Sequence, residues 1–117
     1  YPSGYNTGMV KDEILELSEE VLRAGDSHSL DWGLERLLKI IKRNMDETAK
    51  ALDEDFFPPY IVLPIAQCTR EATEFTGISS LARSLSRWVE RHMDTEGIKD
   101  IKEYADEAEK EAENVPF

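Results

Sequence analysis

The sequence is poor in the residues that form cross-links and metal sites. Cys68 is its single cysteine, so the chain cannot form an internal disulfide bond. With only two histidines besides, it offers no Cys/His cluster that could hold zinc. We expect no metal and no cofactor. A lone thiol is typical of a reducing compartment, so we expect an intracellular, cytoplasmic protein.

Long apolar runs and grouped glycines are also missing. No stretch approaches the roughly 20 apolar residues that span a bilayer, and no basic-then-apolar segment opens the chain. The six glycines are scattered singly, which excludes a glycine-rich phosphate loop. Residues 1–8 are polar and turn-rich and begin with Tyr1. We interpret them as a flexible leader at the boundary of a domain from a longer protein.

Basic residues are few compared with acidic ones. The chain has 25 acidic and 14 basic residues and a formal charge of −11. Phosphate backbones and anionic lipid repel such a chain, so we expect neither nucleic acid nor a membrane as a direct ligand. Residues 94–117 hold nine acids and three bases, which is −6 of the total. We therefore divide the chain into a helical core over residues 9–93 and an acidic C-terminal helix and tail over 94–117.

Apolar residues recur with the 3.6-residue period of a helix in five segments. They predict helices over 9–24, 29–52, 59–76, a fourth from a cap at Ser79 or Ser80 to about Met93, and 98–113. The second segment keeps one apolar face throughout and is predicted as a single helix. Residues 60–66 could instead form a short strand, but no second β-rich segment exists to pair with it.

The predicted fold is all-α: a bundle of four amphipathic helices with a fifth, acidic helix docked weakly at the C-terminus. The inward stripe of the last helix is mostly alanine, with Ala105, Ala108 and Ala112 following Ile98 and Ile101. Alanine buries little apolar area, so we expect residues 98–113 to add little to the core. Deleting residues 98–117 is therefore predicted to leave a folded domain.

An arginine and a histidine stand five residues apart, at Arg87 and His92. This spacing resembles the Arg-x4-His motif of helical ribonucleases that act as paired bundles, a resemblance that covers these two residues. It implies that His92 acts as the acid or base and that Arg87 holds a phosphate. On an ideal helical wheel, however, His92 falls on the apolar face and Arg87 points to the other side. A ribonuclease is therefore a remote alternative.

Three arginines, Arg83, Arg87 and Arg91, follow one another at helical spacing and predict a line on the outer face of the fourth helix. Such a row is either solvated surface or an anion-binding face for an acidic or phosphorylated segment of a protein partner. The acidic segment 94–117, from the same chain or from a second copy, is one ligand that would fit.

Aromatic residues gather around two prolines, with Phe56 and Phe57 before Pro58-Pro59 and Tyr60 after it. These rings predict either an exposed docking knob or a cap on the end of the bundle. Trp32 lies off the apolar stripe of its own helix, toward the side where Leu15 and Leu22 stray from the stripe of the first helix. An additional apolar face of this kind would serve a partner or self-association.

No catalytic set emerges, since no sequence feature places a nucleophile beside either histidine. The sequence therefore predicts a non-enzymatic protein–protein interaction module, the regulatory, adaptor or oligomerisation domain of a larger protein. The alternative is an acidic inhibitor or decoy that covers a basic, nucleic-acid-binding surface of its partner.

Overall fold

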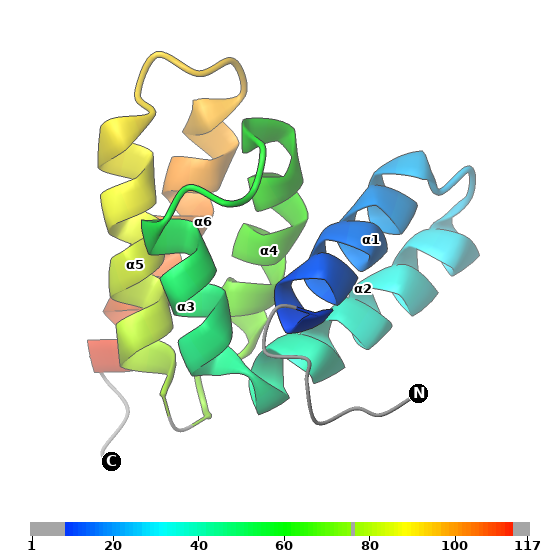
Figure 1. The fold of residues 1–117 in the computed structure, drawn as a ribbon, viewed down its shortest axis with the longest axis horizontal. Helices are drawn as coiled ribbons and strands as arrows, with labels where there is room; N and C mark the ends of the chain where they lie inside the picture. Colours follow the sequence, from blue (N-terminus) through cyan, green and yellow to red (C-terminus); the bar gives the residue numbers. More distant parts are fainter. Residues whose placement is uncertain (1–8, 76, 114–117) are drawn as a thin grey trace.

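The computed structural model describes residues 9–75 and 77–113, and that part of the chain folds into six α-helices (Figure 1). They are α1 (Met9–Arg23), α2 (Ser27–Arg43), α3 (Met45–Asp53), α4 (Pro59–Glu71), α5 (Ile78–Arg91) and α6 (Ile98–Glu113). None of these described residues forms a strand, so the all-α prediction is confirmed. The alternative strand over 60–66 is wrong, because these residues belong to α4. The predicted leader, residues 1–8, lies outside the described residues.

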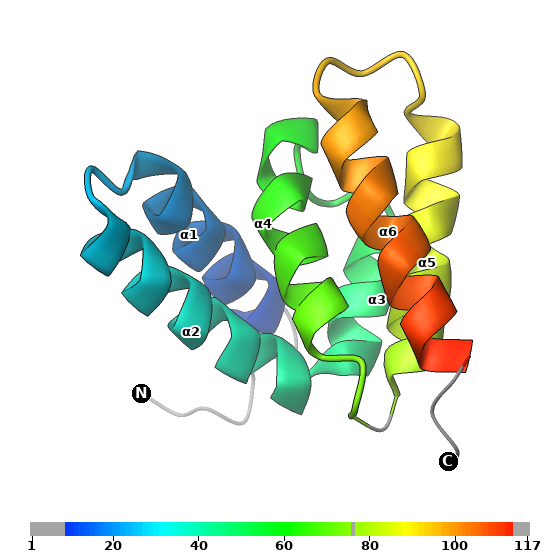
Figure 2. The same cartoon turned by 180° about the vertical axis from the view of Figure 1, so that it is seen from behind.

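Two groups of helices make up the molecule. Helices α1 and α2 form an antiparallel hairpin, while α3 packs on α5, α5 on α6 and α6 on α4. The hairpin joins the other helices mainly through contacts of α1 and α2 with α4. Figures 1 and 2 show that the hairpin and α4 are close near the start of α1 and diverge toward the turn between α1 and α2.

The predicted helix over 29–52 is wrong in one respect: it is broken at Asn44. This residue has φ −139° and ψ 46°, which ends α2, and α3 begins at the next residue. The Asn44 side-chain amide donates to the carbonyl of Ile40 at 2.8 Å. Asparagine side chains compete in this way for backbone groups that a continuous helix would use. Periodicity did not reveal the break because the apolar stripe continues through it, with Ile41 and Met45 both buried.

Two helix ends between α4 and α5 also differ from the prediction. Helix α4 begins at Pro59, a position where the missing N–H costs nothing, and ends at Glu71 rather than near residue 76. Helix α5 begins at Ile78 directly after Gly77, and neither serine acts as its N-cap. Gly77 has φ +93°, a conformation that glycine adopts without the steric cost met by other residues.

The weak docking predicted for the last helix is contradicted. Helix α6 packs against both α4 and α5, and Ile101, Ala105, Ala108 and Ala112 are buried. The alanines bury little area each, but their small side chains let the helix backbones approach closely. Side-chain contacts reinforce the docking, such as the ion pair between Arg70 of α4 and Glu107 at 3.3 Å.

Candidate functional site

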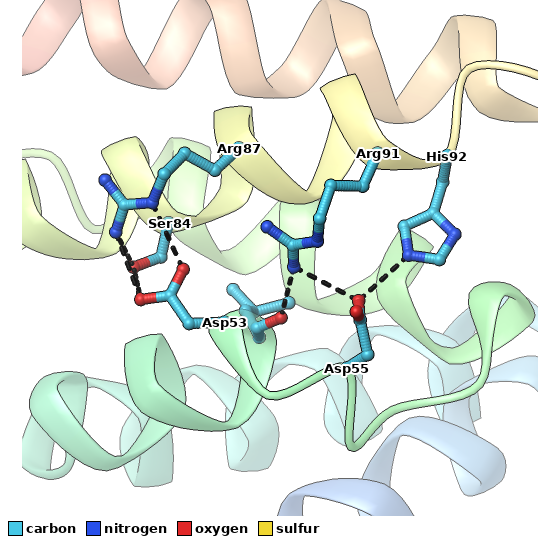
Figure 3. Close-up of polar contacts among 7 residues, drawn as sticks. Asp53, Asp55, Ser84, Arg87, Arg91 and His92 are labelled. Atoms are coloured by element: carbon cyan, nitrogen blue, oxygen red, sulfur yellow. Dashed lines mark hydrogen bonds and ion pairs between the residues drawn. The ribbon is translucent and has the colours of Figure 1, made fainter.

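Six polar side chains lie together where α5 meets the end of α3 and the turn that follows it (Figure 3). We call this group the Arg–Asp–His cluster; it consists of Asp53, Asp55, Ser84, Arg87, Arg91 and His92. It contains two of the three predicted arginines and both residues of the ribonuclease-like motif. Its acidic members lie more than 30 residues earlier in the chain, and the packing of α3 on α5 brings them into reach.

Arg87 and Asp53 form a bidentate ion pair. Arg87 donates from Nε to Asp53 Oδ1 at 3.3 Å and from Nη2 to Oδ2 at 3.0 Å. The hydroxyl of Ser84 donates to the same carboxylate at 3.1 Å. The hydrogen bonds from Arg87 lower the pKa of Asp53, and Asp53 in turn raises the pKa of Arg87. The guanidinium is therefore already occupied by an anion of its own chain.

Asp55 accepts from the two remaining basic residues. Its Oδ1 lies 2.9 Å from His92 Nε2 and 3.1 Å from Arg91 Nη2. The contact with His92, followed by that with Arg91, lowers the pKa of Asp55. The same Arg91 nitrogen also donates to the carbonyl of Leu52 at 2.8 Å, near the end of α3. Arg91 thus adds a second donor to the Leu52 carbonyl, which already accepts from the backbone amide of Asp55.

The backbone of Asp55 adopts the left-handed conformation, with φ +54°. The amide of Phe56 donates to the carbonyl of Ala51, and the amide of Asp55 donates to that of Leu52. These two bonds are the Schellman pattern, in which the left-handed position is usually glycine. An aspartate in this left-handed conformation is less stable than a glycine would be, and the contacts of its carboxylate with Arg91 and His92 offset that cost. The turn is therefore fastened to the end of α5.

His92 and Arg87 do not point to different sides of α5, as the ideal wheel predicted. Both reach the acids at the end of α3 (Figure 3). The wheel fails because His92 follows the last residue of α5 and has φ −124°, outside the helical range. Its imidazole still lies against the apolar core, stacked on the indole of Trp88 with 4.2 Å between ring centroids.

The predicted row of arginines is thus divided. Arg87 and Arg91 turn toward α3 and form ion pairs there, whereas Arg83 is exposed. Asp53 and Asp55 balance the charges of Arg87 and Arg91 one for one. An acidic or phosphorylated ligand would have to displace these carboxylates before it could bind both arginines.

The aromatic segment is not one exposed knob. Phe57 is buried, and Phe56 is half-buried with its ring edge-on to that of Phe57 at 5.3 Å. The ammonium of Lys11 in α1 lies 4.4 Å from the centre of the Phe56 ring and covers one face of it. Tyr60 alone of the three is exposed, by 60%. The interpretation as a cap on the end of the bundle fits Phe57.

Trp32 is 59% exposed, but it does not share a side of the hairpin with Leu22. The guanidinium of Arg36 lies 4.6 Å from the Trp32 ring and pairs with Glu20 at 3.3 Å. Gly33 packs against Val21, and a helix advances about 100° per residue. Glu20 and Leu22 flank Val21 and therefore lie on opposite sides of α1. Trp32 belongs to the Glu20 side.

A second exposed apolar surface lies on the Leu22 side. Leu22 is 43% and Leu30 37% exposed, and they flank the turn between α1 and α2. Leu15 precedes Leu22 by two turns of α1, Leu34 follows Leu30 by one turn of α2, and both are half-buried. We call these four residues the leucine face. Leu30 belongs to the apolar face predicted for residues 29–52 and would therefore be expected in the core. Periodicity shows that residues share a face, but not how far along the helix that face is covered.

Comparisons with protein-family models, with curated proteins and with solved structures found no match. Within residues 9–75 and 77–113, no three His, Cys, Asp or Glu side chains form a group that could hold a metal ion. No helix in the same part of the chain has the length and apolar character needed to cross a membrane.

Proposed function

We propose that this chain is a non-enzymatic protein–protein interaction module and that the α1–α2 hairpin is its binding element. The observation that carries the proposal is the leucine face. Leu22 and Leu30 are large apolar side chains left exposed where the hairpin diverges from α4. Exposed apolar surface of this kind, set among charged residues, is typical of sites that a partner covers.

The Arg–Asp–His cluster supports this choice by being engaged internally. Its two arginines and its histidine already contact Asp53 and Asp55. A ribonuclease would need the Arg87 guanidinium free to bind phosphate. An anion-binding face on the arginine row would need the guanidinium groups of Arg87 and Arg91 free as well. We therefore assign the cluster a structural role and the hairpin the binding role.

The proposal is tested by affinity capture from cell extract with the intact chain. The test variant carries Leu22→Ser with Leu30→Ser; the matched control is Met93→Ser, which alters an exposed apolar residue outside the hairpin. We expect specific proteins to be captured by the parent and the control and to be lost with the double variant. Circular dichroism verifies that all three are equally helical. Undiminished capture by the double variant would contradict the proposal.

Charge favours one second candidate, the acidic inhibitor of a nucleic-acid-binding protein. Residues 12–35 hold eight acids and one base, a net charge of −7. In this case a captured partner should bind a DNA or RNA oligonucleotide, and the oligonucleotide should release it from the chain. A captured partner that binds both at once would exclude this second candidate.

A further inference from the structure

We infer that the leucine face binds a basic, amphipathic helix of the partner protein. This inference rests on the proposed function and deepens it, because it states the chemistry of the partner. Three features carry it: the side of the hairpin on which the leucines lie, the acids around them, and the spacing of the two helices.

The leucine face is a two-row surface. Leu15 and Leu22 form the row on α1, and Leu30 and Leu34 form the row on α2. Leu15 and Leu34 pack against the buried core, and the backbone carbonyl of Leu34 also accepts from the thiol of Cys68 in α4 at 3.7 Å. The face therefore begins at the core and ends exposed at the turn between the two helices.

Acidic side chains border both rows. Glu19 stands between Leu15 and Leu22, four residues after the first and three before the second, so it shares their side of α1. Asp31 stands three residues before Leu34 on α2, and Asp26 caps the N-terminus of α2, where its carboxylate accepts from the amide of Ser29 at 2.7 Å. These acids belong to the segment 12–35, in which acids exceed bases by seven.

This charge selects among the possible occupants. Over the whole hairpin, residues 9–43, eight acids meet six bases, so the excess of acids is confined to the segment 12–35 around the leucines. A second copy docked with its leucine face on the first would bring the same acidic segment against it, and like charges directly opposed disfavour such a complex. An acidic or phosphorylated segment would be repelled for the same reason. A partner with lysine or arginine beside its apolar residues would instead match both the leucines and their acidic border.

The spacing of α1 and α2 indicates the shape of the partner. Axes of packed helices lie about 8–10 Å apart, so the two leucine rows form a shallow track. An amphipathic helix fits such a track with apolar side chains at positions i, i+3, i+4 and i+7. Because only Leu22 and Leu30 are well exposed, the binding should be modest and should weaken as salt is added.

The test uses three fluorescein-labelled peptides and anisotropy titrations against the intact chain. The first peptide has a leucine stripe at helical spacing with lysine at the other positions. The second keeps the stripe and replaces lysine with glutamate, and the third has the lysine composition in scrambled order. We expect the first to bind at least tenfold more tightly than either of the others.

Variants of the chain then locate the binding. Leu22→Ser with Leu30→Ser should weaken the lysine peptide at least tenfold. Glu19→Lys with Asp31→Lys should shift the preference toward the glutamate peptide. Trp32→Ala, on the opposite side of the hairpin, serves as the matched control and should change nothing.

Two results would overturn the inference. Equal binding of the scrambled lysine peptide would show that charge alone attracts it, and equal binding of the glutamate peptide would remove the role of the acids. The proposed function is tested separately, by the capture experiment. If the leucine variant loses captured proteins but the lysine peptide does not bind, the hairpin is a binding element for a partner of different chemistry.

Discussion

Asp55 is the residue whose identity conflicts most clearly with its backbone. We predict that Asp55→Asn destabilises the chain by about 0.5–1 kcal/mol, because it removes charge-assisted contacts that are partly exposed to solvent. Asp55→Gly loses the same contacts but relieves the left-handed backbone. It should therefore be at least as stable as Asp55→Asn. Urea denaturation measures both, and an asparagine variant as stable as the parent would show that the carboxylate contributes nothing.

The two aspartates of the cluster also predict the response to acid. Their pKa values are lower in the folded chain than in the unfolded chain, where aspartate titrates at about 3.9. The stabilisation is therefore complete above that pH and is lost as the pH falls through the lower, folded values. We expect Asp53→Asn with Asp55→Asn to melt closer to the parent at pH 3 than at pH 7.

A neutralised acid outside the cluster is the control for this pH series. Glu90→Gln removes an exposed carboxylate of α5 that forms no ion pair with the described residues. Its melting temperature should follow that of the parent at both pH values. If the difference in melting temperature between the double variant and the parent were the same at pH 3 and pH 7, the two aspartates would not contribute to the loss of stability in acid.

Only half of the cluster could be found from the sequence. The spacing of Arg87, Arg91 and His92 drew attention to them, but nothing local links them to Asp53 and Asp55. That link is made by the packing of α3 on α5, which no helical period encodes. The one available signal was an aspartate at a position after a helix where glycine would be expected.

At the scale of the helix, α6 offers a direct test of close packing. Ala108→Leu should destabilise the chain by about 1–3 kcal/mol, because a larger side chain is forced into a packed contact. Glu103→Leu makes a large apolar substitution on the exposed side of the same helix and should change stability little. Chemical denaturation compares the two. Equal stability of both variants would mean that α6 docks loosely after all.

The structure reverses the prediction that the chain stays folded when residues 98–117 are deleted. Removing α6 would expose the surfaces of α4 and α5 that it covers, so we expect the shortened chain to lose cooperative unfolding. The alanines of α6 bury little area each, but this one helix covers two others, a property that the area per residue does not show. A sharp, cooperative melting transition of the shortened chain would restore the original prediction.

The helices themselves were largely predictable, and their interruptions were not. The stripes over 9–24 and 98–113 closely match α1 and α6 because an amphipathic period is a local property. The break at Asn44 depends on one side-chain amide, and the apolar period gives no sign that α4 ends at Glu71. Such features are decided by single residues and by tertiary contacts.

At the scale of the whole molecule, one core includes residues from both groups of helices. Leu37 of α2 and Leu85 of α5 are both fully buried in it. We predict that Leu37→Ala and Leu85→Ala each cost about 2–5 kcal/mol. Chemical denaturation measures both, and Leu38→Ala on α2, which is only partly buried, should cost less.

Cys68 can report whether the molecule opens as one unit. Burial raises the pKa of its thiol to about 12, and its sulfur lies at the contact between α2 and α4. A thiol reagent should therefore label it only when the chain opens. Because one core joins the groups, Leu37→Ala and Leu85→Ala should accelerate labelling in proportion to their loss of stability. Acceleration by Leu37→Ala alone would reveal independent opening of the hairpin.

The alternating contacts of the last four helices constrain how the chain can fold during synthesis. Helix α3 packs on α5, and α4 packs on α6, so each pair is separated by an intervening helix in the sequence. The hairpin, by contrast, is formed by neighbours and can assemble as soon as both helices emerge. On the ribosome α3 and α4 can contact the hairpin first, but α3 can pack on α5, and α4 on α6, only after an intervening helix has been made. The Arg87–Asp53 ion pair therefore cannot form until both α4 and α5 have been made.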